Sequence, residues 1–366
     1  MSDRDCILLA AGGTGGHLFP AQALAEELAR RGVPVELATD QRALRYGGSF
    51  PARAIHAISA ASPTGGSVTA KAAAVAKLAL GVWQARGLIA RLKPACVVGF
   101  GGYPSAPPLV AASLMGAPSI LHEQNAVLGR ANRFLAGRVH AIATGFTRLD
   151  GVSDAIAAKV VHTGNPVRPA VIAAAAQAFP EFSTGPLRLL VTGGSQGARV
   201  MADVVPAALE ALSPEHRARV VIVQQARGED ETRVREAYAR LGVAAEVAPF
   251  FADLPQRIAE AHLVIGRAGA STVCELAVIG RPSILIPYPF ALDHDQAANA
   301  AELAATGAAT VIKQSEFTAQ RLASEIVAAF ADPEGLTRRA AAAKSAGAPD
   351  AASRLADLVM RTAQLA

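Results

Sequence analysis

The sequence has few of the features that mark secreted, membrane-spanning or nucleic-acid-binding proteins. Its three cysteines, Cys6, Cys96 and Cys274, are far apart and odd in number, which excludes a disulfide framework and a zinc-ligand spacing. No apolar run reaches the roughly 18 residues of a membrane-spanning helix, and the N-terminus runs directly into a predicted strand rather than a signal peptide. No long run of like charge is present either, so a nucleic-acid-binding arm is not expected. We therefore expect a protein of the reducing cytosol.

Hydrophobic residues are abundant, although aromatic residues are scarce. Hydrophobic residues make up 51% of the chain, which excludes an intrinsically disordered protein. A length of 366 residues predicts two domains, at roughly 150 residues per domain. The net charge of +5 is compatible with an anionic membrane surface or a phosphorylated substrate.

Short apolar runs alternate with helical patterns along the chain. Cys6–Ala11 is followed by a helical pattern from about Phe19 to Arg31 and by a second run, Val33–Thr39, which together predict a βαβ unit. Further strands are predicted at "ACVVGF", "APSILHE", "VHAIAT", "KVVHTG", "RVVIVQQ", "HLVIG" and "PSILIP". The last fifty residues or so have three helical patterns. This alternation predicts an α/β protein with parallel sheets.

The opening of the chain is repeated in its second half. "LLAAGGTGGH" at Leu8–His17 matches "LLVTGGSQGA" at Leu189–Ala198, and the first glycines of the two loops are 181 residues apart. We therefore predict two Rossmann-like domains, residues 1–164 and 165–349, joined by a segment rich in Pro and Gly. The C-terminal helix, residues 350–366, is expected to return and brace the first domain.

The first glycine loop, "GGTGGH", lies between a predicted strand and a predicted helix. Glycines admit a ligand close to the backbone, and helix N-terminal amides favour an anion. No Gly-Lys-Ser/Thr follows, so this is not a Walker A loop; the alternative is a tight turn. His17 would lie in the first helical turn, where the dipole lowers its pKa and suits it to acid/base work. It could instead only hydrogen-bond the loop backbone.

Two further segments place polar residues at strand ends in the first half. "VVGFGGYPSAPP" predicts a strand, a glycine loop and a helix start, with Pro104 in the first turn and Ser105 as a cap. In Ile120–Ala136, the polar run His122 to Asn125 follows an apolar strand. Ligands of doubly wound sheets bind at such strand ends, so this run is interpreted as functional.

The second half has its own candidate ligand residues. In Val191–Arg199, Ser195 offers a hydroxyl where a diphosphate would lie. Thr272 and Glu275 have the spacing of a capping box, whereas Glu275 could alternatively accept two ribose hydroxyls. The Asp-x-Asp of "DHDQAANA" is interpreted as a helix start rather than a metal site, with Gln296 and Asn299 in the first turn.

Thr69–Lys93 is a basic helical stretch that contains the only tryptophan. Val75, Leu78, Val82 and Ile89 fall near one face, as expected of a crossover helix packed on a sheet. A membrane-surface patch is the alternative, because basic and aromatic side chains would suit an anionic interface. The residues concerned are Lys71, Lys77, Trp83, Arg86 and Arg91.

Seven motifs, spread over nearly the whole chain, occur in the order seen in the MurG family, which the chain therefore resembles. They are "AGGTGGH", "GFGGYPS", "HEQNAVLGRAN", "TGNPVR", "GGSQGAR", "AGASTVCELAVIGRPSILIPYP" and "DHDQAANA". The resemblance implies a GT-B fold, with two Rossmann-like domains facing a deep cleft. It implies inverting transfer of GlcNAc from UDP-GlcNAc to the C4 hydroxyl of MurNAc in lipid I (undecaprenyl-diphospho-MurNAc-pentapeptide), forming lipid II for peptidoglycan synthesis. The enzyme would be peripheral, at the cytoplasmic face of the bacterial inner membrane, with other cell-wall synthesis enzymes as possible partners and no cofactor or required metal.

The resemblance also implies roles for individual residues. His17 is the candidate general base, and Glu123 is a rival. Donor contacts are implied at Thr14, Gly15, Gly16, Asn125, Arg168, Ser195, Phe251, Ala270, Ser271, Thr272, Val273, Cys274, Glu275 and Gln296. The acceptor diphosphate is expected at Gly13, Thr14, Gly101, Gly102, Tyr103 and Ser105. Two positions depart from some members: Asp295 stands where a second Gln occurs, and Phe251 replaces a smaller aliphatic residue.

Three other functions compete with this one. An NAD(P)-dependent oxidoreductase would explain two Rossmann-like domains but should carry a cleaner G-x-G-x-x-G with a ribose acid. Another GT-B enzyme that uses UDP-GlcNAc, either a nonhydrolysing epimerase or another glycosyltransferase, would share the architecture; the epimerase would need additional catalytic carboxylates and no lipid surface. A noncatalytic sugar-nucleotide-binding or membrane-recruiting subunit would usually carry only one half of the cleft.

Overall fold

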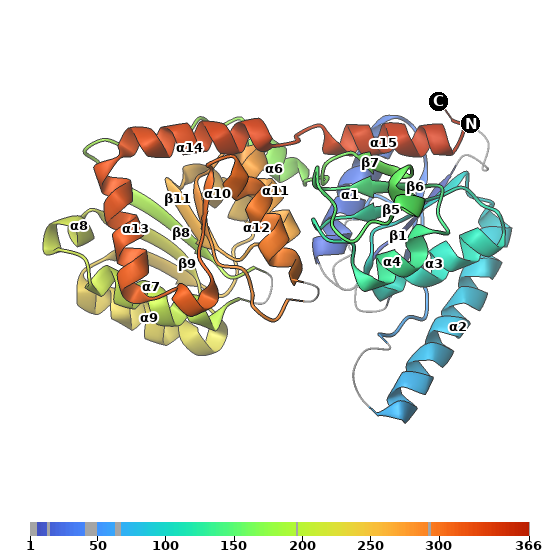
Figure 1. Cartoon of the computed structure of the whole chain (residues 1–366), viewed down its shortest axis with the longest axis horizontal. Helices are drawn as coiled ribbons and strands as arrows, with labels where there is room; N and C mark the ends of the chain where they lie inside the picture. Colours follow the sequence, from blue (N-terminus) through green and yellow to red (C-terminus); the bar gives the residue numbers. More distant parts are fainter. Residues whose placement is uncertain are drawn as a thin grey trace. The chain divides into compact units, whose positions relative to one another are not determined.

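The computed structural model describes residues 6–12, 15–40, 50–62, 67–194, 197–291 and 294–365 (Figure 1). These residues form two compact units. Unit 1 comprises Met1–Arg168 together with Pro349–Ala366, and unit 2 comprises Pro169–Ala348. The boundaries predicted from the sequence follow residues 164 and 349. Each unit is an α/β sandwich around its own parallel sheet.

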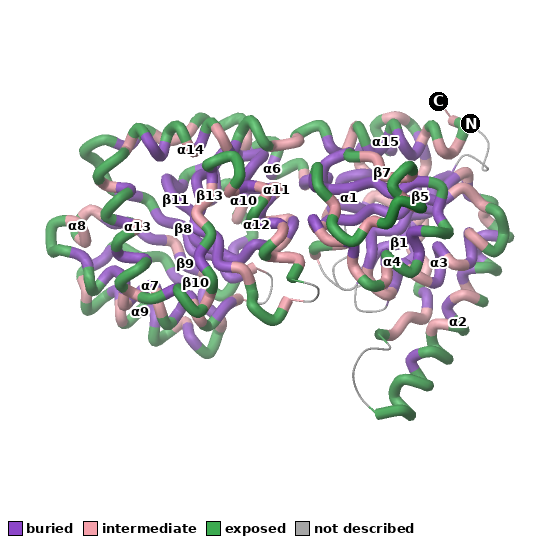
Figure 2. Tube along the Cα trace, viewed as in Figure 1, coloured by how far each residue is buried: buried purple, intermediate pink, exposed green. Residues whose placement is uncertain are grey.

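The sheet of unit 1 has seven parallel strands in the order β3-β2-β1-β4-β5-β6-β7. The central strands are short and fully buried, because helices cover both faces, and this explains their continuous apolar sequences (Figure 2). The strands are β1 (Ile7–Ala10), β2 (Val35–Thr39), β3 (Ile55–Ala57), β4 (Cys96–Gly99), β5 (Ser119–Glu123), β6 (Ala141–Thr144) and β7 (Val160–His162).

The described part of unit 1 contains six helices. They are α1 (Gly15–Arg30), α2 (Val68–Leu92), α3 (Gly102–Leu114), α4 (Arg130–Ala136), α5 (Asp154–Ala157) and α15 (Ala351–Thr362). Helix α15 packs on α1: its Leu355 and Val359 join the core that contains Leu28. At the edge of this contact Arg31 pairs with Asp357 at 2.5 Å. The last helix of the chain thus completes the core of the first unit.

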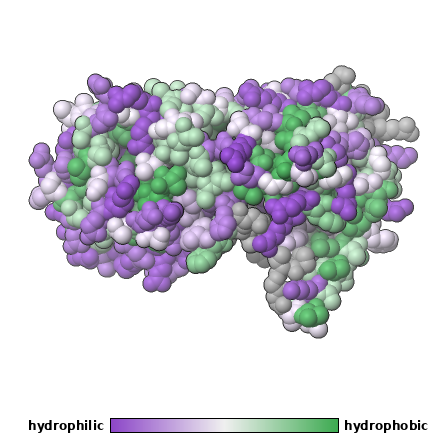
Figure 3. Space-filling view, viewed as in Figure 1, coloured by the Kyte–Doolittle hydropathy of each residue, from purple (hydrophilic) through white to green (hydrophobic). Residues whose placement is uncertain are grey.

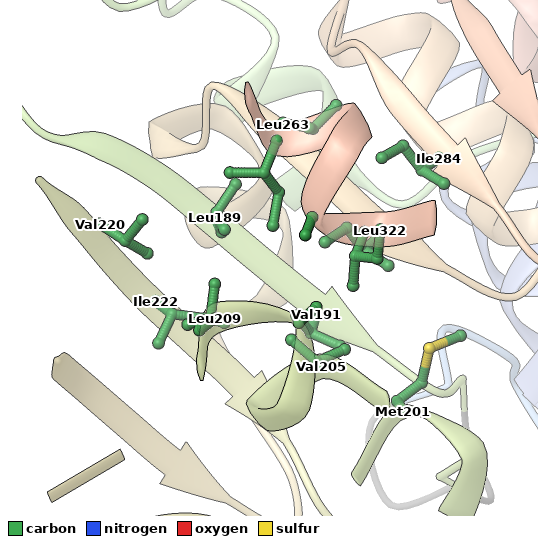
Figure 4. Close-up of a cluster of buried hydrophobic side chains, with 14 of the residues drawn as sticks. Leu189, Val191, Met201, Val205, Leu209, Val220, Ile222, Leu263, Ile284 and Leu322 are labelled. Carbon is green, nitrogen blue, oxygen red and sulfur yellow. The ribbon is translucent and has the colours of Figure 1, made fainter. Parts of the chain in front are cut away.

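The sheet of unit 2 has six parallel strands in the order β10-β9-β8-β11-β12-β13. Figure 4 shows its core, where Leu189 and Val191 of β8 face Val205 and Leu209 of α7 and Leu322 of α13. The strands are β8 (Leu187–Thr192), β9 (Val220–Gln225), β10 (Ala244–Ala248), β11 (Leu263–Gly266), β12 (Ser283–Leu285) and β13 (Ala309–Val311). The helices are α6 (Pro169–Ala174), α7 (Arg199–Glu210), α8 (Pro214–Ala218), α9 (Gly228–Leu241), α10 (Leu254–Glu260), α11 (Ala270–Ile279), α12 (Asp295–Ala305), α13 (Ala319–Ala331) and α14 (Pro333–Ala346).

The two sheets have the same arrangement around their first strands. β1 and β8 are each third in their sheet, and each is flanked by the second and fourth strands of its unit. Each of these strands also leads into a glycine loop and a helix. The internal repeat predicted from the sequence is therefore structural, and both units are Rossmann-like.

Helix α2 buries part of the face that the sequence predicts. The buried residues are Ala74, Gly81, Ala85, Leu88 and Ile89, whereas Val75 is 57% exposed. Ile89 is buried and Val82 packs on the core, as predicted, whereas the first half of the helix buries the small residue Ala74 in place of Val75. None of the helices in the described ranges is long and apolar enough to span a membrane.

Candidate active site

His17 lies in the first turn of α1, which begins at Gly15, four residues before the predicted helix start at Phe19. Its half-buried ring packs on the backbone of Gly101 and Gly102, which precede and begin α3. Both glycines have positive φ, 78° and 70°. A Cβ on Gly102 would lie 3.2 Å from His17 Cδ2 and 3.3 Å from Nε2. Glycine at these positions therefore permits the turn and leaves space for the imidazole.

A hydrogen bond connects His17 to the end of β5. Its Nδ1 lies 3.1 Å from Gln124 Oε1, and Gln124 Nε2 donates to Phe100 O at 2.9 Å. Burial lowers the pKa of His17 below its ordinary value, although hydrogen bonds with Gln124 and the Phe100 backbone act in the opposite direction. The direction matches the sequence-based prediction, but the cause is burial. A neutral imidazole near neutral pH can accept a proton.

Glu123 is 2% exposed, and its carboxylate is engaged by the loop that follows it. Oε1 accepts from the Asn125 backbone amide at 3.0 Å. Oε2 accepts from the Gly129 amide at 3.0 Å and from Asn132 Nδ2 at 2.6 Å. Burial raises the pKa of Glu123, and these hydrogen bonds lower it in part. The geometry is that of a carboxylate that holds the turn between β5 and α4.

The residues around the start of α3 correct one expectation. The helix begins at Gly102, with Gly101 at the N-cap, so Ser105 lies inside the first turns and is not a cap. Ser105 is fully buried, and its Oγ donates to Gly102 O at 3.0 Å. Its expected contact with the acceptor diphosphate stays a prediction. Tyr103 is half-buried in the first turn.

Other predicted residues of unit 1 begin α1, contact it or follow β5. Gly15 and Gly16 begin this helix, and the Arg168 guanidinium stacks on the Phe19 ring at 4.3 Å. Asn125 follows β5, and its Nδ2 donates to Glu123 at 3.4 Å. Gly13 and Thr14 lie outside the described residues. The structure therefore gathers His17, Gly101, Gly102 and Gln124, whereas the roles of the remaining residues stay predictions.

In unit 2 the second glycine loop follows β8 and turns back tightly. A Cβ on Gly193 would lie 2.2 Å from the Ala198 amide nitrogen, so only glycine fits there. The Gly193 amide donates to Gln225 Oε1 at 3.0 Å, which links the loop to the end of β9. Ser195 lies outside the described residues. Gln225 was not identified from the sequence, because its partner lies on a separate strand.

The helix start after β11 corrects the predicted capping box. Helix α11 begins at Ala270 with Gly269 at its N-cap, so Thr272 and Glu275 both lie within the helix. Glu275 is 6% exposed. The other predicted donor residues of this helix, Ser271, Val273 and Cys274, are in its first turns, and Ser271 and Cys274 are half-buried. The structure places all these residues at an amide-rich helix N-terminus.

Gln296 connects α12 to two neighbouring loops. Its Oε1 accepts from the amides of Tyr288 at 2.9 Å and Ala268 at 3.3 Å. Asn299 Nδ2 donates to Ala268 O at 3.2 Å, which strengthens the same connection. Asp295 Oδ1 accepts from the Gln296 amide at 2.7 Å, so its side chain stabilises the helix start.

Phe251 is 7% exposed, and the Arg257 guanidinium stacks on its ring at 4.3 Å. Because the Phe251 ring is buried, a ligand could contact this residue only through its backbone atoms.

The described residues contain no group of three or more His, Cys, Asp or Glu side chains that could hold a metal ion. Asp293 of the Asp-x-Asp sequence lies outside them.

Two family models match the chain. The glycosyltransferase family 28 N-terminal domain matches residues 7–144, and the family 28 C-terminal domain matches residues 188–355. A relative from Methylorubrum extorquens is 58% identical over 98% of this chain and 97% of its own length. One from Rhodopseudomonas palustris is 56% identical over 100% of both chains. Both are named UDP-N-acetylglucosamine–N-acetylmuramyl-(pentapeptide) pyrophosphoryl-undecaprenol N-acetylglucosamine transferase.

Solved structures agree with these relatives. The structure of Acinetobacter baumannii MurG superimposes with a TM-score of 0.80 at 29% identity, covering 98% of this chain and 99% of that one. A UDP-GlcNAc 2-epimerase from Neisseria meningitidis has a TM-score of 0.69 at 14% identity, over 97% of this chain and 100% of that one, and shows the fold alone. The predicted GT-B fold is thus confirmed. The chain belongs to glycosyltransferase family 28 and, within it, to the MurG N-acetylglucosaminyltransferases.

Proposed function

We propose that this enzyme transfers GlcNAc from UDP-GlcNAc to the C4 hydroxyl of MurNAc in lipid I, with inversion, to form lipid II. The observation that carries the proposal is the 58% identity, over 98% of the chain, to a relative whose name states this donor and acceptor. The half-buried histidine on the Gly101–Gly102 turn supplies a group of suitable chemistry.

His17 acts as the general base in this proposal. Its neutral imidazole takes the proton of the acceptor hydroxyl as the hydroxyl oxygen attacks C1 of GlcNAc. The bond between C1 and the diphosphate oxygen breaks, and UDP leaves with the bonding electrons. His17 is preferred to Glu123 because the Glu123 oxygens accept hydrogen bonds from the Gly129 amide and from the residues of its own loop.

Unit 2 binds the donor in this proposal. The first-turn amides of α11 and the glycine loop after β8 would stabilise the charge that develops on departing UDP. Glu275 would accept ribose hydroxyls, and the Phe251 backbone would contact uracil. Because the Gln296 carbonyl oxygen already binds two amides, its Nε2 is the atom that would meet a GlcNAc hydroxyl.

Transfer of labelled GlcNAc to a short-chain lipid I analogue tests the reaction. We expect labelled lipid II analogue and free UDP. Hydrolysis or epimerisation of UDP-GlcNAc without transfer would overturn the proposal, and epimerisation would support the epimerase alternative. We also expect no metal requirement, so activity should persist in excess chelator; strict dependence on a divalent cation would contradict this part of the proposal.

The base assignment is tested by comparing His17→Ala with Glu123→Gln. General bases contribute about 10²–10⁴-fold to a rate, so His17→Ala should lower kcat by at least that lower bound. A loss of less than about tenfold in kcat would remove His17 from this role. A larger kcat loss for Glu123→Gln, in a protein that remains folded, would favour Glu123 instead.

We further propose that α2 attaches the enzyme to an anionic membrane surface, as expected for a lipid-linked acceptor at the cytoplasmic face of the inner membrane. Val68, Leu80 and Trp83 are 84%, 47% and 73% exposed. Figure 3 shows the apolar side chains along this helix, and exposed Lys71, Lys77, Arg86 and Arg91 lie on the same helix. Apolar and basic side chains on one exposed helix are typical of an interfacial helix.

Sedimentation with anionic and zwitterionic vesicles tests this attachment. Each basic residue near such a surface contributes about 1 kcal/mol. Lys71→Ala/Lys77→Ala should therefore weaken binding to anionic vesicles by about 2 kcal/mol, or about 30-fold. The control Lys313→Ala/Arg338→Ala removes two exposed charges from unit 2 and should not weaken it. Equal binding by all three proteins would refute the proposal.

A further inference from the structure

Behind His17 lies a buried chain of hydrogen bonds that the proposed reaction does not use. Gln124 is 2% exposed and His122 is fully buried. Gln124 Nε2 lies 3.0 Å from His122 Nδ1, and His122 Nε2 lies 3.3 Å from Gly164 O. His122 and Gln124 belong to one segment at the C-terminal end of β5, whereas Gly164 lies 42 residues further along the chain than His122. Their arrangement determines which atoms of His17 carry protons.

The orientation of the Gln124 amide follows from its partners. The Phe100 backbone carbonyl can only accept, so the Gln124 atom 2.9 Å away must be the donor, Nε2. His122 gives the same orientation: because Gly164 O also only accepts, His122 carries its proton on Nε2, and its Nδ1 accepts from Gln124. Burial lowers the pKa of His122 to about 4, so this neutral form persists near neutral pH.

Gln124 Oε1 therefore faces His17 Nδ1 as an acceptor. A neutral imidazole has one donor and one acceptor nitrogen, so His17 must carry its proton on Nδ1. Its Nε2 then holds the lone pair. This nitrogen is the one 3.3 Å from the Cβ position of Gly102, at the turn that begins α3.

We propose that Gln124 is a positioning residue that holds His17 in the tautomer with the proton on Nδ1, leaving Nε2 as the base. The inference rests on the proposed role of His17 in the reaction. Gln124 is suited to this task because its amide orientation is fixed by Phe100 O and by His122. As a neutral partner it orients the ring without adding a negative charge, so it offsets only part of the lowering of the His17 pKa that burial causes.

Kinetics of a double-mutant cycle provide the first test. Gln124→Met retains the length of the side chain but removes the amide, and it should lower kcat by about 10–100-fold, as loss of a group that orients a histidine does. The KM for UDP-GlcNAc should not change. In a His17→Ala background the same substitution should have no further effect, because Gln124 acts through His17. Equal losses in the two backgrounds would overturn the inference.

Gln22→Met is the matched control. Gln22 is another glutamine of unit 1, partly buried rather than buried, and its Nε2 donates to Glu26 Oε1 on the same helix. This substitution should leave kcat unchanged. The outcomes separate the two levels of the proposal: a weak effect of His17→Ala refutes the base itself, whereas a strong His17→Ala effect with a weak Gln124→Met effect refutes only the role of Gln124.

The tautomer can also be measured directly, without any substitution. In ¹⁵N-histidine-labelled protein, NMR shifts of the two ring nitrogens distinguish the protonated from the unprotonated one, and His17→Ala assigns the signals. The wild type should show the proton on Nδ1 of His17, and a proton on Nε2 would overturn the inference. Gln124→Asn, whose amide is one methylene too short to reach the ring, should lose this preference while it remains folded.

Discussion

Replacing Gly102 by alanine probes the space around His17 most directly. An L-residue at φ 70° is strained, and this conformation costs roughly 1–2 kcal/mol. The added Cβ would also lie 3.3 Å from His17 Nε2, closer than an ordinary van der Waals contact. The ring must then move by a few tenths of an ångström, and the methyl group would shield the proposed base. Because a 1 Å misplacement can cost about 10²-fold in rate, we expect kcat to fall about tenfold or more.

Gly116→Ala separates strain from contact. Gly116 has φ 66°, close to that of Gly102, and a Cβ there would have no heavy atom within 4 Å. Both variants should therefore lose similar stability, with unit 1 melting about 2–8 °C lower by differential scanning calorimetry. Only Gly102→Ala should lose transferase activity in the lipid I assay. Equal activity of the two variants, measured well below their melting temperatures, would refute the placement of His17 beside this turn.

Three further predictions concern unit 1. Burial lowers the pKa of His122 from its ordinary value of 6.5 to about 4. Between these pH values the unfolded chain binds more protons than the folded one, so the free energy of unfolding should fall by about 3 kcal/mol as the pH is lowered from 6.5 to 4. The urea midpoint should fall less steeply with decreasing pH in His122→Gln. Leu355→Ala should destabilise unit 1 by about 2–5 kcal/mol, seen as faster hydrogen exchange in α1 but not in α7. Glu123→Gln presents an NH₂ group to amide donors and should cost about 1–3 kcal/mol, measured by thermal unfolding.

The central strands of each sheet could be predicted from the sequence because complete burial requires continuous runs of apolar residues there. β1 and β4 are covered on both faces, so every residue in them is apolar or small. The sequence patterns did not predict three edge strands, β3, β10 and β13. Each of them is half-exposed or exposed over most of its length, so no continuous apolar run marks it.

The spacing of residues also predicts the wrong first residue for a helix where the sequence offers two possible helix starts. Thr272 and Glu275 have capping-box spacing, but Gly269 begins the helix earlier and places both inside it. The same happened at α3, where the Gly101–Gly102 turn starts the helix before Ser105. Contacts over long separations, such as His17 with Gln124, 107 residues apart, have no local signature at all. They depend on which strand ends the sheet brings together.

The return of α15 to unit 1 has a consequence for synthesis. Leu355 and Val359 belong to the core beneath α1, yet they are translated only after all of unit 2. Unit 2 is one continuous segment and can complete its core earlier, although domains are usually expected to fold from the N-terminus onward. On the ribosome, the part of the unit 1 core that α15 covers therefore stays open until this helix has been made. The first half of this enzyme is the last to be finished, and a chaperone that covers apolar surfaces would find its substrate there.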